Sequence, residues 1–209
     1  MALSDYLRFR GCKHIEGNCQ QIYGQVTDLI ALSSGGIDKE SERPLRIMEI
    51  GFNAGHSAEV FLNNNCKYLV SFDLGDHDYV MVAKEYMDRI YPNRHQLVLG
   101  DSRETIPKFM AQFPESEFDL IFIDGGHDYD IAKSDLENCL KIATKDTLII
   151  MDDIVEGQQY QWTYGPTRAW SEKVSEKKIQ HIGHREYYSG RGMAWGKIIS
   201  VKSDGVDPR

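Results

Sequence analysis

The stretch Leu45–Ser57 reads LRIMEIGFNAGHS, and it decides how the rest of the chain is interpreted. A short apolar run passes through Glu49, the chain turns at Gly51, and a helix is expected after Gly55. This pattern predicts a strand, a tight glycine loop and the start of a helix. Backbone N–H groups in such a loop, together with the positive end of the helix dipole, favour a small anionic ligand group.

The composition is that of a soluble globular domain. The chain has 209 residues, 41% of them hydrophobic and 27% charged, enough for one large domain with its own core. The net charge of -8 counts against nucleic acid as a partner, because binding along a phosphate backbone needs basic clusters. No apolar run approaches the roughly 20 residues that span a bilayer, so no membrane partner is expected.

The N-terminus and the cysteines favour a cytoplasmic protein. Met1–Tyr6 lacks the basic and then apolar layout of a signal peptide. The four cysteines form no C-x-x-C pair and no metal-finger spacing, so reduced thiols are expected. They are Cys12, Cys19, Cys66 and Cys139.

Residues 1–44 are predicted to be a helical lead-in followed by a linker. Residues 1–18 show no clear periodicity and are interpreted as irregular or as a short helix. Apolar residues at spacings of three and four then predict a helix over residues 19–32, which ends at the Ser-Ser-Gly-Gly run. The polar segment Asp38–Pro44 carries the chain to the first strand.

Strands and helices are expected to alternate from residue 45 onward. The predicted strands are 45–50, 68–72, 95–99, 118–123 and 147–151, and the predicted helices are 57–64, 77–91, 103–112 and 129–142. Five strands separated by helices predict a parallel, doubly wound α/β sheet. The strand cores are continuous apolar runs, as in strands that helices cover on both faces.

The C-terminal part departs from this alternation. A polar and aromatic loop over residues 158–165 precedes a helix predicted at 166–175. Two further strands, at 179–188 and 193–201, flank Ser-Gly-Arg-Gly and predict an antiparallel hairpin. The expected fold is thus a mostly parallel, seven-stranded sheet over residues 45–202, with a flexible tail at 203–209.

Acidic residues follow the predicted strands. Ligands of an open parallel sheet bind beyond the carboxyl ends of its strands, and four of the five predicted parallel strands end in acid. These acids are Asp73, Asp101, Asp124, Asp152 and Asp153. Glu49 precedes the end of the remaining strand, so a ligand site rich in carboxylates is predicted at this edge.

The glycine loop differs from that of a dinucleotide-binding protein. The loop reads E-x-G-x-x-x-G, whereas the dinucleotide pattern is G-x-G-x-x-G. Asn53 stands where the second glycine would be, and the acid Glu49 precedes the turn. These differences favour a ligand that is smaller than a pyrophosphate and carries a cationic part; a purely structural turn is the alternative.

Two of the acids are placed to bind a nucleoside. Asp73 follows Gly51 by 22 residues, at the end of the second strand, where an acid can accept hydrogen bonds from both ribose hydroxyls. Asp101 and Ser102 follow the third strand, where an adenine would lie. A cap for the helix that begins at Arg103 is the alternative interpretation of Asp101.

Together these motifs resemble the class I S-adenosylmethionine-dependent methyltransferases. The resemblance rests on EIGFNAGHS, Asp73, LGDS, DLIFIDGGH and IIMDDI, and it covers residues 45–155. More narrowly, the chain is similar to the metal-dependent O-methyltransferases, which include catechol, macrocin-type and cephalosporin-hydroxylase-group members. The resemblance implies S-adenosylmethionine as cofactor, bound by Glu49, Gly51, Asn53, Gly55, Ser57, Asp73, Asp101, Ser102 and Asp124.

Three acids at the fourth and fifth strands predict a metal site. Neighbouring strands lie roughly 4.8 Å apart, which would place Asp124, Asp152 and Asp153 around one point. Close carboxylates resist ionisation, and a hard divalent cation such as Mg²⁺, Mn²⁺ or Ca²⁺ would relieve the conflict. The resembling family holds its metal at these positions, often with Asn at the last one. A helix cap with two solvated acids is the alternative.

His127 is the predicted general base, because an imidazole accepts protons near neutral pH. The resemblance implies lysine at this position in catechol-type enzymes and histidine in macrocin-type enzymes. The expected acceptor is therefore a hydroxyl of a small molecule or glycan, with sugars favoured over a catechol or phenol. A nucleotide-dependent oxidoreductase and a non-catalytic S-adenosyl-binding module are weaker alternatives.

The aromatic segment after the metal acids is the candidate acceptor site. Aromatic faces with polar edges suit sugars as well as planar phenols, although the same residues could pack the helix onto the sheet. The candidates are Trp162, Tyr164, Arg168, Tyr187 and Arg191. The C-terminal hairpin is also a possible homodimer surface.

Overall fold

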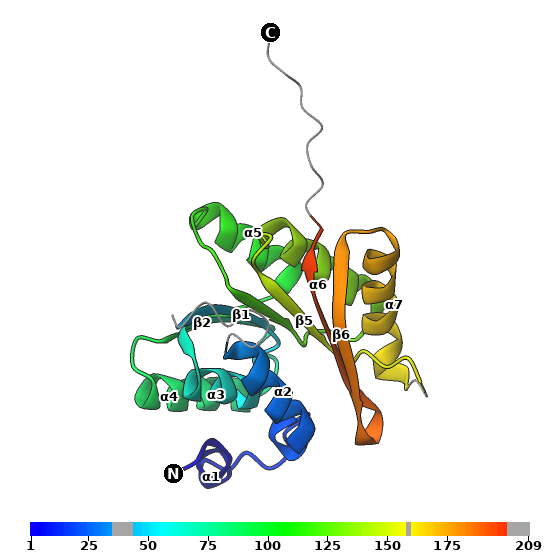
Figure 1. The fold of residues 1–209 in the computed structure, drawn as a ribbon. Helices are drawn as coiled ribbons and strands as arrows, with labels where there is room; N and C mark the ends of the chain where they lie inside the picture. The colour runs from blue at the N-terminus through cyan, green and yellow to red at the C-terminus, as the bar shows by residue number, and fades with distance from the viewer. Residues whose placement is uncertain (35–43, 158–159, 200–209) are drawn as a thin grey trace.

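A computed structural model describes residues 1–34, 44–157 and 160–199, and within these ranges seven strands form one sheet (Figure 1). The spatial order is β3-β2-β1-β4-β5-β7-β6. The strands are β1 (Leu45–Ile50), β2 (Cys66–Asp73), β3 (His95–Leu99), β4 (Leu120–Ile123), β5 (Leu148–Asp152), β6 (Ile179–Tyr187) and β7 (Arg191–Ile198).

The predicted fold class is confirmed. Strands β1 to β5 pair in parallel, whereas β7 pairs antiparallel with both β5 and β6. The chain runs outward from β1 through β2 to β3 and then returns to the other side of β1 as β4. This reversal of strand order opens a crevice at the carboxyl ends of β1 and β4, where doubly wound sheets bind ligands.

Helices cover both faces of the sheet (Figure 1). One layer contains α1 (Leu3–Phe9), α2 (Tyr23–Ser33), α3 (His56–Asn63) and α4 (Tyr79–Ile90). The other layer contains α5 (Ser102–Gln112), α6 (Tyr129–Ile142) and α7 (Gln161–Ser175). Two short 3-10 turns are η1 (Cys19–Gln21), whose Cys19 packs against the first core, and η2 (Tyr188–Gly190).

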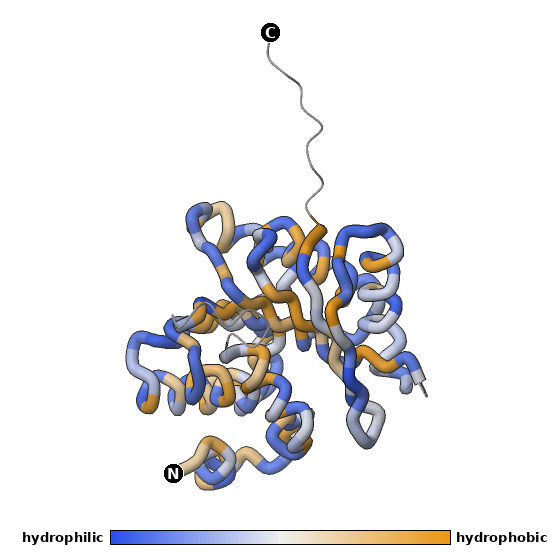
Figure 2. The backbone as a smooth tube through the Cα atoms, viewed as in Figure 1, coloured by the Kyte–Doolittle hydropathy of each residue, from blue (hydrophilic) through white to orange (hydrophobic). Residues whose placement is uncertain are grey.

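The sheet separates two apolar cores because successive side chains of a strand point to opposite faces. Ile47 of β1 and Phe122 of β4 belong to the core under α1 to α4, whereas Met48 and Ile123 belong to the core under α5 to α7. The central strands form the hydrophobic middle of the molecule in Figure 2. Burial on both faces explains why these strands read as continuous apolar runs.

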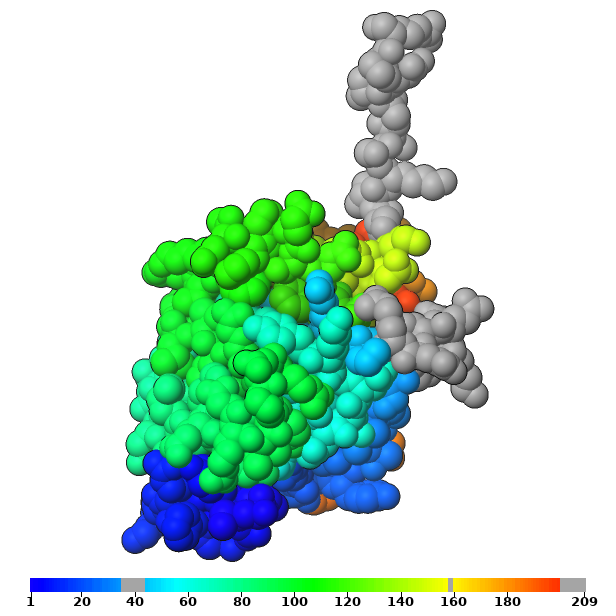
Figure 3. All heavy atoms as spheres, turned by 90° about the vertical axis from the view of Figure 1, so that its left-hand side faces the viewer, coloured from blue at the N-terminus to red at the C-terminus, as the bar shows by residue number. Residues whose placement is uncertain are grey.

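The N-terminal helices pack on the same core as the sheet. The Tyr6 hydroxyl on α1 donates to Glu85 of α4 at 2.8 Å, and the Arg89 guanidinium lies 4.5 Å from the centre of the Tyr6 ring. Figure 3 shows this N-terminal segment, in dark blue, against the surface that α4 contributes. Leu29 of α2 is fully buried in the same cluster.

Two predicted helices begin a full turn or more from the expected residue. The helix predicted from residue 19 begins at Tyr23, because the Asn18 side chain accepts a hydrogen bond from the Gln20 N–H and caps a separate 3-10 turn. The helix predicted from residue 166 begins at Gln161, so Pro166 lies inside it. The hydroxyl of Thr163 accepts a hydrogen bond from the N–H of Tyr160, which stabilises this earlier start.

The predicted C-terminal hairpin is confirmed, with its turn at Tyr188–Gly190 and β7 beginning two residues earlier than expected. The linker residues 38–43, the first residues of the predicted loop at 158–159 and the tail at 203–209 lie outside the described residues. No helix in the described ranges is long and apolar enough to cross a bilayer.

A pair of glycine substitutions tests the crossing of the glycine loop and β4. Gly51 has φ +90°, and a Cβ there would lie 1.8 Å from the carbonyl oxygen of Asp124, whereas Gly11 has φ +88° with nothing within 4 Å of its Cβ position. We expect Gly11→Ala to cost about 1 kcal/mol and Gly51→Ala at least about 3 kcal/mol in free energy of unfolding. Urea denaturation measures both, and equal losses would contradict the close approach of the loop and β4.

Candidate functional site

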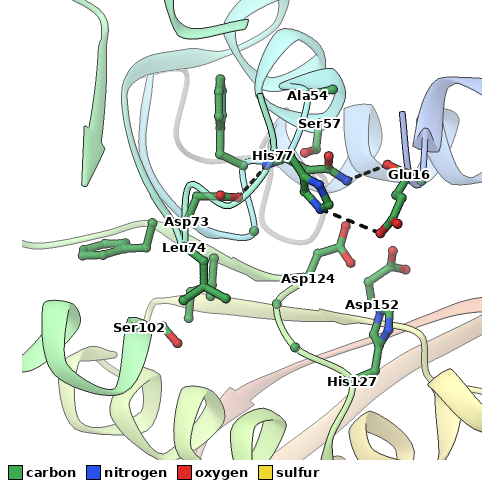
Figure 4. Close-up of a pocket in the computed structure, with 18 of the residues that line it drawn as sticks. Glu16, Ala54, Ser57, Asp73, Leu74, His77, Ser102, Asp124, His127 and Asp152 are labelled. Carbon is green, nitrogen blue, oxygen red and sulfur yellow. Dashed lines mark hydrogen bonds and ion pairs between the residues drawn. The ribbon is translucent and has the colours of Figure 1, made fainter. Parts of the chain in front are cut away.

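A cavity of about 510 Å³ lies at the carboxyl ends of β1, β2 and β4, where the strand order reverses (Figure 4). The loop after β1, the ends of β2 and β3, the loop after β4 and a segment before η1 line it. Figure 4 shows Asp73 and Leu74 on one side and Asp124, Asp152 and His127 on another. This size suits a small organic ligand.

The glycine loop positions the acid at the end of β2. Gly51 and Asn53 both have positive φ, which turns the chain sharply after β1. The Asn53 N–H donates to Asp73 Oδ2 at 2.7 Å, and the Gly75 N–H donates to Asp73 Oδ1 at 2.8 Å. The Asp73 carboxylate is thereby fixed at the cavity wall, where the sequence analysis places the ribose.

Glu49 lies behind this wall rather than in it. The side chain is fully buried, and its two oxygens accept hydrogen bonds from the hydroxyls of Ser57 at 2.5 Å and Ser71 at 2.6 Å. Burial raises the pKa of Glu49 to about 8, with the nearby acids adding to the effect. Ser57 lines the cavity, so Glu49 acts on it through that hydroxyl.

Asp101, which the sequence places near the adenine, caps a helix and also lines the cavity. Asp101 accepts a hydrogen bond from the Arg103 N–H at 2.9 Å and so caps α5, and the Arg103 side chain lowers the pKa of Asp101. The cap is therefore observed, and Asp101 and Ser102 also line the cavity. Their contact with an adenine stays a prediction. The Ser102 hydroxyl donates to the buried Asp135 at 2.6 Å.

Acids and a histidine meet at the opposite end. One potential metal-ligand atom from each of Asp124, His127 and Asp153 lies within 4.8 Å of the other two. His127 Nε2 is 2.9 Å from Asp153 Oδ2, and this hydrogen bond raises the pKa of His127. Enclosure by the protein, followed by the charge of Asp153, raises the pKa of Asp124 to about 7.

His127 rather than Asp152 is the third member of this group. Both oxygens of Asp152 accept hydrogen bonds from the Gln25 side-chain amide at 2.9 Å, which directs Asp152 toward α2. Burial, together with Asp124, raises the pKa of Asp152 well above its usual range. Asp152 still lines the cavity. Of the three predicted metal acids, Asp124 and Asp153 therefore lie together with His127, whereas Asp152 is held apart by Gln25.

The N-terminal segment supplies site residues that the sequence analysis missed. The Asn53 side-chain amide donates to the Glu16 carbonyl at 2.6 Å, and the Glu16 carboxylate lies 3.8 Å from His77 (Figure 4). Glu16, His77 and Cys19 line the cavity, and Gln25 holds Asp152 from α2. No local pattern signals these contacts, because each joins residues far apart in the sequence.

The acceptor candidates divide between two places. Arg191, at the start of β7, lines the main cavity. Tyr164 and Arg168 line a second cavity of about 480 Å³ beside α7, and His127 is the residue that the two linings share within the described part of the chain.

The other two acceptor candidates have structural partners. Trp162 stacks on Tyr160, with ring centres 4.8 Å apart. The Tyr187 hydroxyl donates to Asp28 at 2.6 Å. Among the described residues, the linings of these two cavities do not include four of the predicted site residues, Trp162, Tyr187, Gly55 and Asp153.

Comparison with known proteins identifies the family. Residues 48–154 match a family described as "Methyltransferase domain", which is half of the chain. The chain therefore belongs to this methyltransferase family, and the class inferred from the sequence motifs is confirmed. The matched region begins in β1 and ends just after β5, so it contains the glycine loop and all the acids at the strand ends.

Solved structures of methyltransferases share the fold. The O-methyltransferase from Bacillus cereus in complex with SAH superimposes with a TM-score of 0.71 at 17% identity, over 94% of this chain and 90% of that one. TomG from Streptomyces achromogenes, in complex with SAM, gives 0.70 at 15%, over 95% and 88%. CalS11, a TDP-rhamnose 3'-O-methyltransferase of calicheamicin biosynthesis, gives 0.61 at 23%, over 84% and 80%.

One relative is similar in sequence. The uncharacterised protein y4gI of Sinorhizobium fredii is 26% identical over 173 residues. The match covers 76% of this chain but only 18% of that relative, so the chain spans less than a fifth of its length.

A substitution at Glu49 tests its buried, protonated state. The ordinary glutamate pKa is 4.5 and that of folded Glu49 is about 8, so folding takes up a proton between these pH values and stability falls as pH rises. We expect Glu49→Gln to have a higher free energy of unfolding than the unsubstituted protein, measured by urea denaturation. The difference should grow from pH 5 to pH 8 and reach a few kcal/mol. The exposed Glu115→Gln is the control, and parallel pH curves for Glu49→Gln would refute the prediction.

Proposed function

We propose that this protein transfers a methyl group from S-adenosylmethionine to a hydroxyl of a sugar or similar vicinal diol, with the help of a divalent cation. The observation that carries the proposal is the group of Asp124, His127 and Asp153 beside the cavity at the strand ends. Such a group can hold a hard cation and accept a proton at the same place.

The main cavity supports S-adenosylmethionine as the methyl donor. Asp73 is fixed where ribose hydroxyls would bind, and Ser102 and Asp101 lie where the adenine would bind. Ser57 and the Gly51 loop would contact the methionine part. The related structures from Bacillus cereus and Streptomyces achromogenes are complexes with SAH and SAM, respectively.

The residues present fit a divalent cation. Asp124 and Asp153 offer carboxylate oxygens, and one ligand atom from each lies within 4.8 Å of the other and of a ring nitrogen of His127. Magnesium is commonly bound by one or two carboxylates together with substrate oxygens and water. When bound, such a cation would lower the pKa of an acceptor hydroxyl and neutralise the acids around it.

His127 is proposed as the base. Asp153 holds its Nε2, as an acid orients a catalytic histidine, and half of the side chain is exposed to solvent. The acceptor hydroxyl gives its proton to the imidazole while its oxygen attacks the methyl carbon. With S-adenosylmethionine bound, the carbon–sulfur bond would break and the sulfur would keep the electron pair, giving the neutral thioether S-adenosylhomocysteine. Positioning of the two reactants supplies most of the catalysis.

The acceptor is proposed to reach His127 from the second cavity. This cavity shares His127 with the cofactor cavity and presents Tyr164 and Arg168 to the acceptor. The Arg168 guanidinium stacks on Tyr129 at 3.9 Å from the ring centre, which gives it a fixed position at the cavity wall. A sugar hydroxyl is favoured over a phenol because it is the weaker acid and needs a base, and because CalS11 acts on a sugar nucleotide.

An acceptor screen tests this proposal directly. Sugars, sugar nucleotides and catechols are incubated with S-adenosylmethionine and Mg²⁺ or Mn²⁺, and a gain of one methyl mass is sought. Methylated sugars with unmodified catechols are expected. Absence of S-adenosylhomocysteine binding in titration calorimetry would refute the cofactor, whereas methylation of catechols alone would refute the acceptor class.

Removal of the imidazole tests the base. We expect His127→Ala to lower turnover by about 10²–10⁴ while leaving affinity for S-adenosylhomocysteine within a factor of about two. Turnover is followed by mass spectrometry and affinity by calorimetry, with the exposed His14→Ala as control. Near-normal turnover of His127→Ala would exclude the base role.

Chelation and an acid substitution test the cation. We expect exhaustive chelation to lower turnover at least about 100-fold and Mn²⁺ or Mg²⁺ to restore it. Asp153→Asn should lose Mn²⁺ binding in calorimetry, whereas Asp5→Asn, at an exposed acid on α1, should retain it. Activity that survives chelation would remove the metal from the mechanism.

A further inference from the structure

Asp135 is a buried acid that the proposed chemistry leaves without a role. It lies on α6 and is 1% exposed, and its Oδ1 accepts a hydrogen bond from the Ser102 hydroxyl at 2.6 Å. Its Oδ2 is buried and has no hydrogen-bond partner within the described ranges. A buried carboxylate oxygen without a hydrogen bond costs free energy, so we expect a hydrogen-bond donor next to Oδ2.

Asp153 repeats this arrangement on the other side of the site. Its Oδ2 lies 2.9 Å from His127 Nε2, and its Oδ1 is buried and likewise unpaired among the described residues. Each acid therefore uses one oxygen to hold a residue of the cofactor cavity. The residue that Asp135 holds lies at the adenine end, and the residue that Asp153 holds is the proposed base.

The two acids line one small cavity. It measures about 10 Å³ and lies beneath the Gly125–Gly126 loop, with Ala132, Met151 and Pro166 around it. A Cβ at Gly125 would come within 2.7 Å of Asp135 Oδ2, so glycine leaves the carboxylate its place under the loop. This volume is about the minimum that accommodates one water molecule.

We propose that a single buried water occupies this cavity and donates one hydrogen bond to Asp135 Oδ2 and the other to Asp153 Oδ1. A continuous chain then runs from Ser102 through Asp135, the water and Asp153 to His127. Asp135 is a positioning residue, since it acts on His127 through the water and Asp153. The importance of this chain for catalysis rests on the proposed function, whereas the water site itself does not.

Water matches the site better than a cation does. A water molecule has two O–H donors, and two buried acceptors need one each. A hard cation takes six or more oxygen ligands. The other acids of this lining are Asp124, which we assign to the neighbouring cation site, and Asp152, which already accepts two hydrogen bonds from Gln25. The chain also gives a physical route by which an adenine that contacts Ser102 could orient the base.

A high-resolution crystal structure of the protein alone tests the water directly. The expected result is one density peak at about 2.7–3.2 Å from both Asp135 Oδ2 and Asp153 Oδ1. Absence of this peak overturns the proposal. A peak with several oxygen contacts near about 2.3 Å would identify a cation and would also overturn it.

Nitrogen NMR of the His127 ring tests the coupling without requiring methyl transfer. Asp135→Asn replaces one acceptor by an amide, and Ser102→Ala removes the far end of the chain. Both are expected to shift the His127 ring resonances, Asp135→Asn by more. Cys139→Ala, one turn further along α6 in the same buried core, is the packing control and should leave these resonances in place.

The spectra separate this proposal from the proposed function. Unshifted His127 resonances in Asp135→Asn overturn the coupling even if the protein methylates sugars, and shifted resonances support it even if no acceptor is found. If Asp135→Asn does not fold, Ser102→Ala decides: a shift relative to Cys139→Ala supports the chain, and no shift overturns it. In an active enzyme, Asp135→Asn should also lower turnover severalfold with little change in acceptor KM.

Discussion

The close approach of two backbone segments sets the geometry of the whole site. The carbonyl oxygen of Asp124 lies where a Cβ of residue 51 would be, so the loop after β1 can pass the end of β4 only because residue 51 is glycine. β1 and β4 are neighbours at the point where the strand order reverses. The loop that faces the proposed cofactor and the loop that carries the reactive acids consequently share one cavity.

This approach concentrates negative charge, which opposes folding. Enclosure raises the pKa of Asp124 to about 7 and that of Glu49 to about 8. Burial on both faces of the sheet must outweigh this cost, and Arg191 reduces it by facing the acids from β7. A site in this state favours ligands that bring positive charge, because such ligands relieve repulsion that the apo protein carries. A sulfonium cofactor and a divalent cation both meet that requirement.

The sequence predicted those parts of the fold whose causes are local. Apolar runs indicated the five parallel strands, and the acids after four of these runs indicated the edge where a ligand is expected, because strand burial and carboxyl-end binding leave a direct pattern. The predicted start of α7 was wrong because the helix begins with aromatic and polar residues followed by Gly165 and Pro166, a composition that resembles a loop. Glu49 was placed correctly on β1, but nothing local indicates that Ser57 stands between it and the cavity. The contact of Gln25 with Asp152 spans 127 residues, and only the packing of α2 on the sheet creates it.

The segments outside the matched family region have a distinct part in the site. The family match covers residues 48–154, which supply the glycine loop, Asp73 and the acids of β4 and β5. Gln25 and Glu16 precede this region and Arg191 follows it, yet all three act on the same cavity. Gln25 fixes the direction of Asp152, and the positive charge of Arg191 opposes the rise in the pKa of Asp124. The central region thus supplies most of the proposed cofactor cavity, while the flanking segments orient the acids around it and shift their pKa values. Acceptor preference should therefore follow these flanking segments and α7 more closely than it follows the glycine loop.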